Sequence, residues 1–148
     1  MAQLLYALQF RGQAQPVSES PTVLKAATSA PSAAITTTVG PQGVAGRLEP
    51  CGGGSATFES RVTLGEDSEF QEDGTITFGE GHRLRFSTVG RGHLGPSVDP
   101  SLSTGVVMWR IDEGEGQFAG ASGYITSNFS VSAAGEVVDN HFGVIFVP

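Results

Sequence analysis

The stretch from Glu113 to Pro148, EGEGQFAGASGYITSNFSVSAAGEVVDNHFGVIFVP, decides the fold class of this chain. It opens with a turn that contains four spaced glycines and one aromatic residue, namely Gly114, Gly116, Phe118, Gly120 and Gly123. One β-patterned run follows this turn, and a second follows the short break at 133–135. Alternating β-patterned runs and short glycine-containing breaks are typical of antiparallel strands joined by tight turns. We therefore predict an all-β fold.

The size and composition of the chain are those of one globular domain, which we predict over residues 1–148. Its 21 glycines and 8 prolines are spread between short apolar runs, which indicates many turns. A chain of this length buries roughly two-thirds of the surface that its unfolded form exposes. It therefore needs neither a metal nor a disulfide to fold.

The charge balance argues against polyanionic partners. The chain carries 15 acidic and 8 basic residues, for a formal charge of −7, and no basic stripe. This excess repels phosphate, so we predict no nucleic acid and no anionic membrane as partner. Cys51 is alone and has no histidine near it in sequence, which indicates an incidental loop cysteine. Residues 1–11 lack the basic start of a signal peptide, and a cytoplasmic location is predicted.

Several segments alternate in the manner of strands. The clearest are 4–11 and 55–64, and the other candidates are 22–26, 35–39, 44–49, 74–79, 82–89, 105–111, 124–132 and 136–147. Residues 12–33 are rich in Ser, Ala, Pro and Thr and are expected to form a covering loop. A second long loop is expected over 91–104, where a lid would lie.

About eight or nine short strands with frequent turns are typical of a closed antiparallel barrel or a sandwich. Several strands are apolar on one face and mixed on the other, as in a barrel whose inner wall surrounds a ligand. An eight-stranded ring leaves room for side chains or one small ligand. We therefore favour a barrel.

The turn Gly114-Glu-Gly116-Gln-Phe118-Ala-Gly120-Ala-Ser-Gly123 resembles the Gly-x-Gly-x-Phe-x-Gly-Ala-x-Gly turn of the allene oxide cyclase barrel, which dirigent proteins carry in looser form. The order of elements over about residues 80–130 is also similar. The resemblance implies an eight-stranded antiparallel β-barrel of the allene oxide cyclase and dirigent (calycin-like) type, with a hydrophobic cavity open at one end. It further implies an isomerase or cyclase that holds a hydrophobic substrate in a near-attack conformer.

The chain also departs from these families. Plant allene oxide cyclases carry a catalytic glutamate in the N-terminal strand, whereas the run from Tyr6 to Arg11 contains no acid. Dirigent proteins are secreted, and this chain shows no signal peptide. A carrier of an apolar metabolite and an oligomeric structural barrel without ligand therefore stay open beside the enzyme. The expected partners are a small hydrophobic molecule and further copies of the chain, as a dimer or trimer.

Four polar residues are predicted to place the catalytic hydrogen bonds, namely Tyr6, His82, Tyr124 and Asn128. A buried tyrosine hydroxyl must find a partner, and an amide supplies both a donor and an acceptor. His82 lies at a strand mouth on the face that carries Leu84 and Phe86. Substrate contacts are expected from the aromatic residues Phe58, Phe78, Phe86, Trp109 and Phe142. No cofactor is expected, and no metal, because the three histidines lack ligand spacing.

Other charged residues are weaker candidates. Asp139 and His141 share one face of the last strand and would tune each other as an acid–base pair. The other face, from Val138 to Phe146, is more apolar, so we expect it inside and the pair on the outer wall. Arg83 and Arg85 are expected to face solvent or an interface, opposite Leu84 and Phe86. The loop residues Arg91, His93 and Asp99 would close over a ligand if that loop were a lid.

Overall fold

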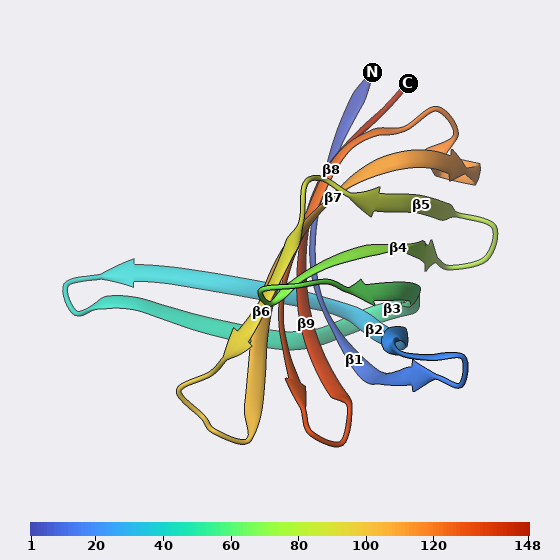
Figure 1. Ribbon diagram of the computed structural model, residues 1–148. Coiled ribbons are helices and arrows are strands. Elements are labelled where there is room, and N and C mark those ends of the chain that lie inside the picture. Colours follow the sequence, from blue (N-terminus) through green and yellow to red (C-terminus); the bar gives the residue numbers. More distant parts are fainter.

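The computed structural model describes all 148 residues and contains nine strands and one short 3-10 helix (Figure 1). The elements are β1 (Ala2–Val17), β2 (Ser20–Gly40), β3 (Gly43–Leu64), β4 (Glu69–Phe78), β5 (Arg83–Thr88), β6 (Gly92–Pro96), β7 (Leu102–Glu115), η1 (Gly116–Phe118), β8 (Ser122–Ser132) and β9 (Glu136–Val147). Every strand pair is antiparallel, which confirms the all-β prediction. The structure contains no helix that is long and apolar enough to cross a lipid bilayer.

The strands close into a ring. Hydrogen bonds connect β3, β2, β1, β9, β8, β7, β5 and β4 in that order, and β4 pairs back with β3. The result is a barrel-like ring of eight strands, in which β1 and β9 lie side by side and bring the two termini together (Figure 1). The ninth strand, β6, fills the gap between β4 and β7 beyond the end of β5.

The covering loop expected over 12–33 does not exist. β1 continues to Val17 and β2 starts at Ser20, so nearly the whole segment is paired. Its small residues are strand residues, and Ala26, Thr28 and Ala30 face the interior. The loop prediction was wrong because a segment rich in small residues was interpreted as a loop. In the structure these small side chains belong to strands, and those that face inward leave space inside the ring.

The lid loop expected over 91–104 is also mostly strand. β6 occupies Gly92–Pro96 and β7 begins at Leu102. Gly92 is held against the ring of Phe70, where a side chain at residue 92 would collide with that ring. Both edges of β6 are paired, so this segment is part of the wall and leaves only 97–101 as a turn.

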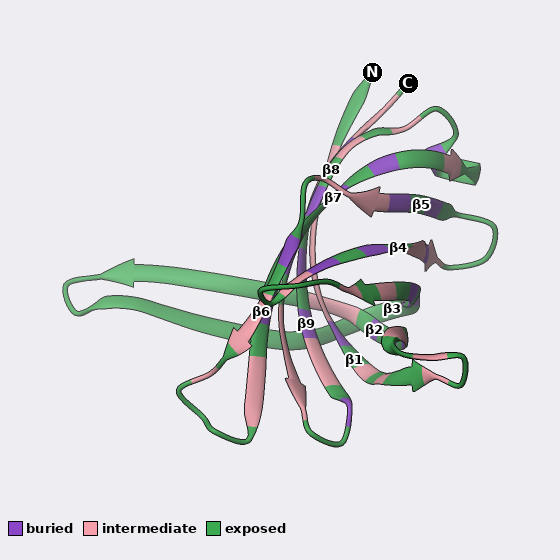
Figure 2. Ribbon diagram, in the orientation of Figure 1, coloured by how far each residue is buried: buried purple, intermediate pink, exposed green.

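Aromatic side chains fill the middle of the ring. The alternation of 55–64 places Phe58 of β3 inside, where it packs against Phe86 of β5 and Trp109 of β7. The ring centroids of Trp109 and Phe86 are 4.4 Å apart, and those of Phe58 and Phe86 are 5.4 Å apart. Figure 2 shows the buried residues as short bands along the ring strands. Space for a ligand is therefore confined to the ends of the ring.

The glycine-spaced turn joins β7 to β8 through η1, and its glycines are not equivalent. Gly120 has φ +74°, and a Cβ there would lie 3.0 Å from Cγ of Pro148. Gly123 has φ +131°, and a Cβ there would lie 2.2 Å from the carbonyl oxygen of Val144 on β9. The first position is thus limited mainly by its backbone conformation, and the second also by the neighbouring strand.

We expect Gly120→Val to lower the free energy of unfolding by about 2 kcal/mol, because a branched residue is strained in the left-handed region. Gly123→Ala should cost more, since the added methyl group collides with backbone. Urea unfolding measures both. The matched control is Gly95→Ala on β6, where nothing lies within 4 Å of the added methyl group and which should change little. A Gly123→Ala variant as stable as the wild type would contradict the assigned strand contact.

Candidate functional site

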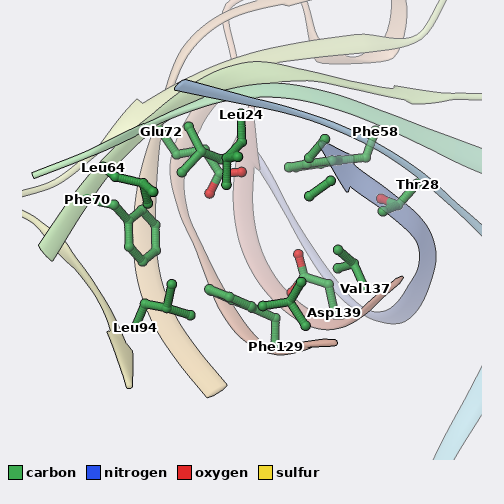
Figure 3. A pocket seen from close by; sticks show the side chains of 14 residues that line it. Leu24, Thr28, Phe58, Leu64, Phe70, Glu72, Leu94, Phe129, Val137 and Asp139 are labelled. Carbon is green, nitrogen blue, oxygen red and sulfur yellow. The ribbon is translucent and has the colours of Figure 1, made fainter. Parts of the chain in front are cut away.

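One end of the ring contains a small apolar cavity of about 70 Å³ (Figure 3). Of its 14 lining residues 11 are hydrophobic, and the three others are Thr28 from β2, Glu72 from β4 and Asp139 from β9. The hydrophobic ones are Ala14, Leu24, Ala26, Phe58, Val62, Leu64, Phe70, Leu94, Phe129, Val131 and Val137. Two carboxyl groups therefore share a cavity whose walls are otherwise almost wholly apolar.

Glu72 is a buried acid in the middle of an apolar row. On β4 it alternates with Phe70 and Ile76, which are also buried, and the strand pleat therefore turns its side chain inward. The Ser60 hydroxyl donates to Oε2 of Glu72 at 2.6 Å. Burial raises the pKa of Glu72 from 4.5 to about 8, the Ser60 hydrogen bond opposes this, and the negative charge of Asp139 adds to it. Glu72 is thus a neutral carboxylic acid at pH 7.

The Trp109 indole also affects the pKa of Glu72. Its N–H lies near enough to lower the pKa of Glu72 slightly, although Nε1 reaches no partner in hydrogen-bond geometry. The effect is smaller than that of burial, so the acid keeps its proton. Trp109 is itself fully buried and packs against Phe58, which lines the cavity.

Asp139 occupies the opposite side of the cavity, where two donors surround its carboxyl group. The Ser127 hydroxyl donates to Oδ1 at 2.6 Å, and Nε2 of His141 lies 2.9 Å from Oδ2. All three side chains are buried. Hydrogen bonds from both sides are what a carboxylate needs in order to keep its charge inside a protein. Nδ1 of His141 has no partner, so the tautomer with its proton on Nε2 is the one that donates to this carboxyl group.

His141 lies in an aromatic cage. Its ring centroid is 4.2 Å from that of Phe10, 5.0 Å from that of Trp109 and 5.3 Å from that of Phe58. The cage holds the imidazole in one orientation and leaves Nδ1 without a protein partner. His141 therefore orients Asp139 toward the cavity and is a positioning residue there.

Figure 3 shows the Glu72 and Asp139 side chains pointing into the cavity from opposite walls. Burial keeps Glu72 protonated at neutral pH, whereas Asp139 is held by hydrogen bonds from Ser127 and His141. The two carboxyl groups therefore have different environments within one cavity. The hydroxyl of Thr28 also lines the cavity and has no protein partner, so it is a third polar contact for a ligand.

The four polar residues predicted from sequence are not brought together. His82 is exposed in the turn before β5, where Nδ1 accepts from the Gln117 backbone N–H at 2.9 Å. Tyr124 is 56% exposed and Asn128 is exposed, both on the outside of β8. Only the Tyr6 hydroxyl is buried in the interior, where burial and then the charge of Asp139 raise its pKa. Tyr6 packs edge-on against Phe78 and does not line the cavity.

The predicted aromatic contacts divide in the same way. Phe58 lines the cavity, and Phe86 and Trp109 are buried behind it. Phe78 packs on Tyr6 and Phe118 instead. Phe142 is 51% exposed and lies on the outer wall, contrary to expectation.

The facing of β9 was predicted the wrong way round. Asp139, His141 and Ile145 point inward, whereas Asn140 and Phe142 point outward. Gly143 also lies on the inner row, and the Tyr6 ring occupies the space that a side chain at this position would need. Hydrophobicity alone chose the wrong face, since the outer face of this strand is itself apolar.

The charged candidates elsewhere make no site. Arg85 pairs with Glu113 at 3.0 Å on the surface, which confirms its outward facing. Arg91 pairs with Glu69 at 3.1 Å, and His93 is exposed on β6. The Ser101 hydroxyl and backbone N–H donate hydrogen bonds to Asp99 and lower its pKa. Asp99 therefore stabilises the turn between β6 and β7. No three His, Cys, Asp or Glu side chains are grouped as metal ligands.

Comparisons with protein-family models, with curated proteins and with solved structures find no match. The chemistry of the cavity is therefore the observation on which a functional assignment rests.

Proposed function

We propose that this protein is an isomerase that moves a proton within a small apolar substrate carrying a carbonyl oxygen. The observation that supports this is the placement of two carboxyl groups on opposite walls of one apolar cavity, namely Glu72, whose pKa burial raises to about 8, and Asp139. Acid and base at two ends of a bound molecule are what a proton shift requires.

The reaction follows from the positions of the two groups. Asp139 removes a proton from the carbon next to the carbonyl group, and the C–H electron pair forms a carbon–carbon double bond. The carbonyl π electrons move to oxygen, which takes the proton of Glu72 and becomes an enol. Asp139 then returns its proton to the far carbon of the conjugated system while Glu72 recovers its own. The product is an isomer, and no electron acceptor or cofactor is consumed.

The apolar walls support this chemistry in two ways. They exclude water, which strengthens the interaction between each carboxyl group and the charge that develops on the substrate. They also keep Glu72 protonated, because burial is the main cause of its raised pKa. His141 and Ser127 hold the Asp139 carboxylate in one position from behind.

The cavity limits the size of the substrate. Its volume of about 70 Å³ is well below the roughly 300–1,000 Å³ of drug-sized ligand sites. A short-chain ketone with a β,γ double bond matches both the apolar lining and the single oxygen function. A longer substrate would not fit wholly within this volume.

We further propose that the ring is a barrel of the allene oxide cyclase and dirigent type. The closed order of eight strands and the glycine-spaced turn between β7 and β8 support this assignment. The acid that the plant cyclases place in the N-terminal strand is absent here. The carboxyl groups in the cavity come instead from Glu72 of β4 and Asp139 of β9. A proton-transfer reaction distinct from that of the plant enzymes follows from this difference.

The test is proton exchange in D₂O with a short-chain β,γ-unsaturated ketone as probe, followed by NMR. The wild type should catalyse both deuterium uptake next to the carbonyl group and migration of the double bond. Asp139→Asn and Glu72→Gln should each lower the rate by about 10²–10⁴-fold.

The matched controls remove an exposed acid from the same strands, with Asp73→Asn on β4 and Glu136→Gln on β9. Both should keep the wild-type rate. Binding of the probe without exchange would identify a carrier and overturn the isomerase. Exchange that survives in Asp139→Asn would remove Asp139 from the reaction.

A further inference from the structure

A two-stranded arm projects from the ring. It consists of residues 33–40 of β2 and 43–50 of β3, which pair only with each other (Figure 1). Its side chains are exposed along almost its whole length, and Val39 is 80% exposed (Figure 2). Within the ring, residues 24–29 of β2 and 56–63 of β3 are paired on both sides.

An irregularity in pairing separates the arm from the ring. Pro31 pairs with Ser55, and Ala33 pairs with Pro50, so a single residue of β2 opposes the four residues 51–54 of β3. The Ser32 hydroxyl donates to the carbonyl oxygen of Gly54 at 2.6 Å and fixes the shorter side of this bulge. A bulge of this kind redirects a strand. The arm therefore leaves the ring at a defined point.

The arm has one apolar face and one polar face. Residues that pair directly share a face, so Ile35 with Leu48 and Val39 with Val44 form one apolar row. The other face carries Thr36 opposite Arg47, together with Glu49, which forms an ion pair with Arg47. No charge lies on the apolar face, and nothing in the chain covers it.

The outer wall of the ring carries a second uncovered apolar surface, formed by outward side chains of β1, β9, β8 and β7. Pairing places them in two adjacent rows, which are Leu5–Val144–Tyr124–Arg110 and Ala7–Phe142–Thr126–Met108, with Val106 beside the second row. Arg110, at the β7 end of the first row, is the one charged residue in these rows, and it forms an ion pair with Asp112. Of the 11 large hydrophobic residues that are exposed, four lie on the arm and five on the outer wall.

We propose that the apolar face of the arm covers the outer wall of a second copy of this chain. A two-stranded hairpin is marginally stable alone in water, so the arm needs a partner surface. The partner surface must be mainly apolar, as the two rows of the outer wall are. The arm points away from its own ring (Figure 1), and its exposed side chains show that its own wall does not cover it. Exchange between two copies covers both surfaces at once.

The dimensions of the two surfaces agree. Eight residues per strand give the arm a length of about 26 Å, and four strands give the wall a width of about 19 Å. A reciprocal arrangement doubles the contact, as in two-fold symmetric dimers with identical patches. The charged face of the arm then stays in solvent, with Arg47 and Glu49 exposed.

The first test measures the molar mass in solution by analytical ultracentrifugation over a range of concentrations. The wild type should form dimers or larger oligomers. The double variant Ile35→Lys/Leu48→Lys should dissociate at least about 100-fold more readily, because it places charge on the apolar face. The control Thr36→Lys/Thr38→Lys adds the same charge to the polar face and should assemble like the wild type. A monomeric wild type, or an apolar-face variant that assembles normally, overturns the proposal.

The outer wall is tested in the same way. Phe142→Lys should dissociate the oligomer, while Thr57→Lys, which places a lysine on the outside of β3, should not. Circular dichroism and the fluorescence of the buried Trp109 report whether each variant retains its fold. Phe142→Lys that stays folded and assembled would contradict the proposed contact.

A cross-linking experiment identifies which surfaces meet. Val39→Cys and Tyr124→Cys are prepared separately in a Cys51→Ser background, mixed, and treated with a short bismaleimide. The expected product is a covalent pair of one Val39→Cys chain and one Tyr124→Cys chain. The control pair replaces Tyr124→Cys with Thr57→Cys and should give none. Cross-links between two arms only would show edge-to-edge or face-to-face pairing of the arms and overturn the contact with the wall.

Discussion

Trp109→Ala should lower the free energy of unfolding by about 3–5 kcal/mol, which is the cost of emptying a large buried aromatic site. Trp109 is fully buried between Phe86, Phe58 and His141. All three would lose packing inside the ring, where side chains of β3, β5, β7 and β9 meet. Urea-induced unfolding followed by circular dichroism measures the change.

Trp109→Phe separates the volume of this residue from its N–H group. Phenylalanine fills most of the site, so the loss should be closer to about 1–2 kcal/mol. The pKa of Glu72 should rise slightly, because the indole N–H that favours its charged form is gone. NMR of labelled glutamate carboxyl groups measures this pKa. If Trp109→Ala cost no more than Trp109→Phe, the filled interior would be contradicted.

Glu72→Gln should remove a pH dependence of stability. In the native state Glu72 has a pKa of about 8, against 4.5 ordinarily. Between these values the native state holds a proton that the unfolded chain releases, so stability falls as pH rises. The slope from one such group is about 1.4 kcal/mol per pH unit, and the loss is complete above pH 8. Glutamine holds no titrating proton and still accepts from Ser60.

The stability of Glu72→Gln relative to the wild type should therefore increase from pH 5 to pH 8 and then level off. Chemical unfolding at each pH gives this difference, in which the other titrating groups cancel. Asp73→Asn, which changes the exposed neighbour, should show a much smaller trend. A constant difference between Glu72→Gln and the wild type would show that Glu72 titrates normally. The isomerase rate of the wild type should fall as pH rises through about 8, because Glu72 then loses its proton.

The strands of the ring were largely predictable, because alternation and glycine turns are local signals. The run 55–64 alternates with Phe58 inside, as found. Segment 12–33 was missed because Ala, Ser and Thr have weak preferences, and pairing with two neighbours decides their state. The signal for Glu72 was present, since it interrupts the alternating apolar residues Phe70, Ile76 and Phe78. An acid in such a row is a candidate buried group.

The sequence by itself determined that this chain is all β, where its main turns lie and which residues share a face of each strand. These properties depend on neighbours a few residues apart. Only the tertiary structure decided which faces point inward, because both faces of β9 carry apolar residues and ring closure buries the one with Asp139 and His141. It also brought Glu72 to the cavity opposite Asp139. Burial at that point changes the protonation of Glu72, and no local pattern specifies burial.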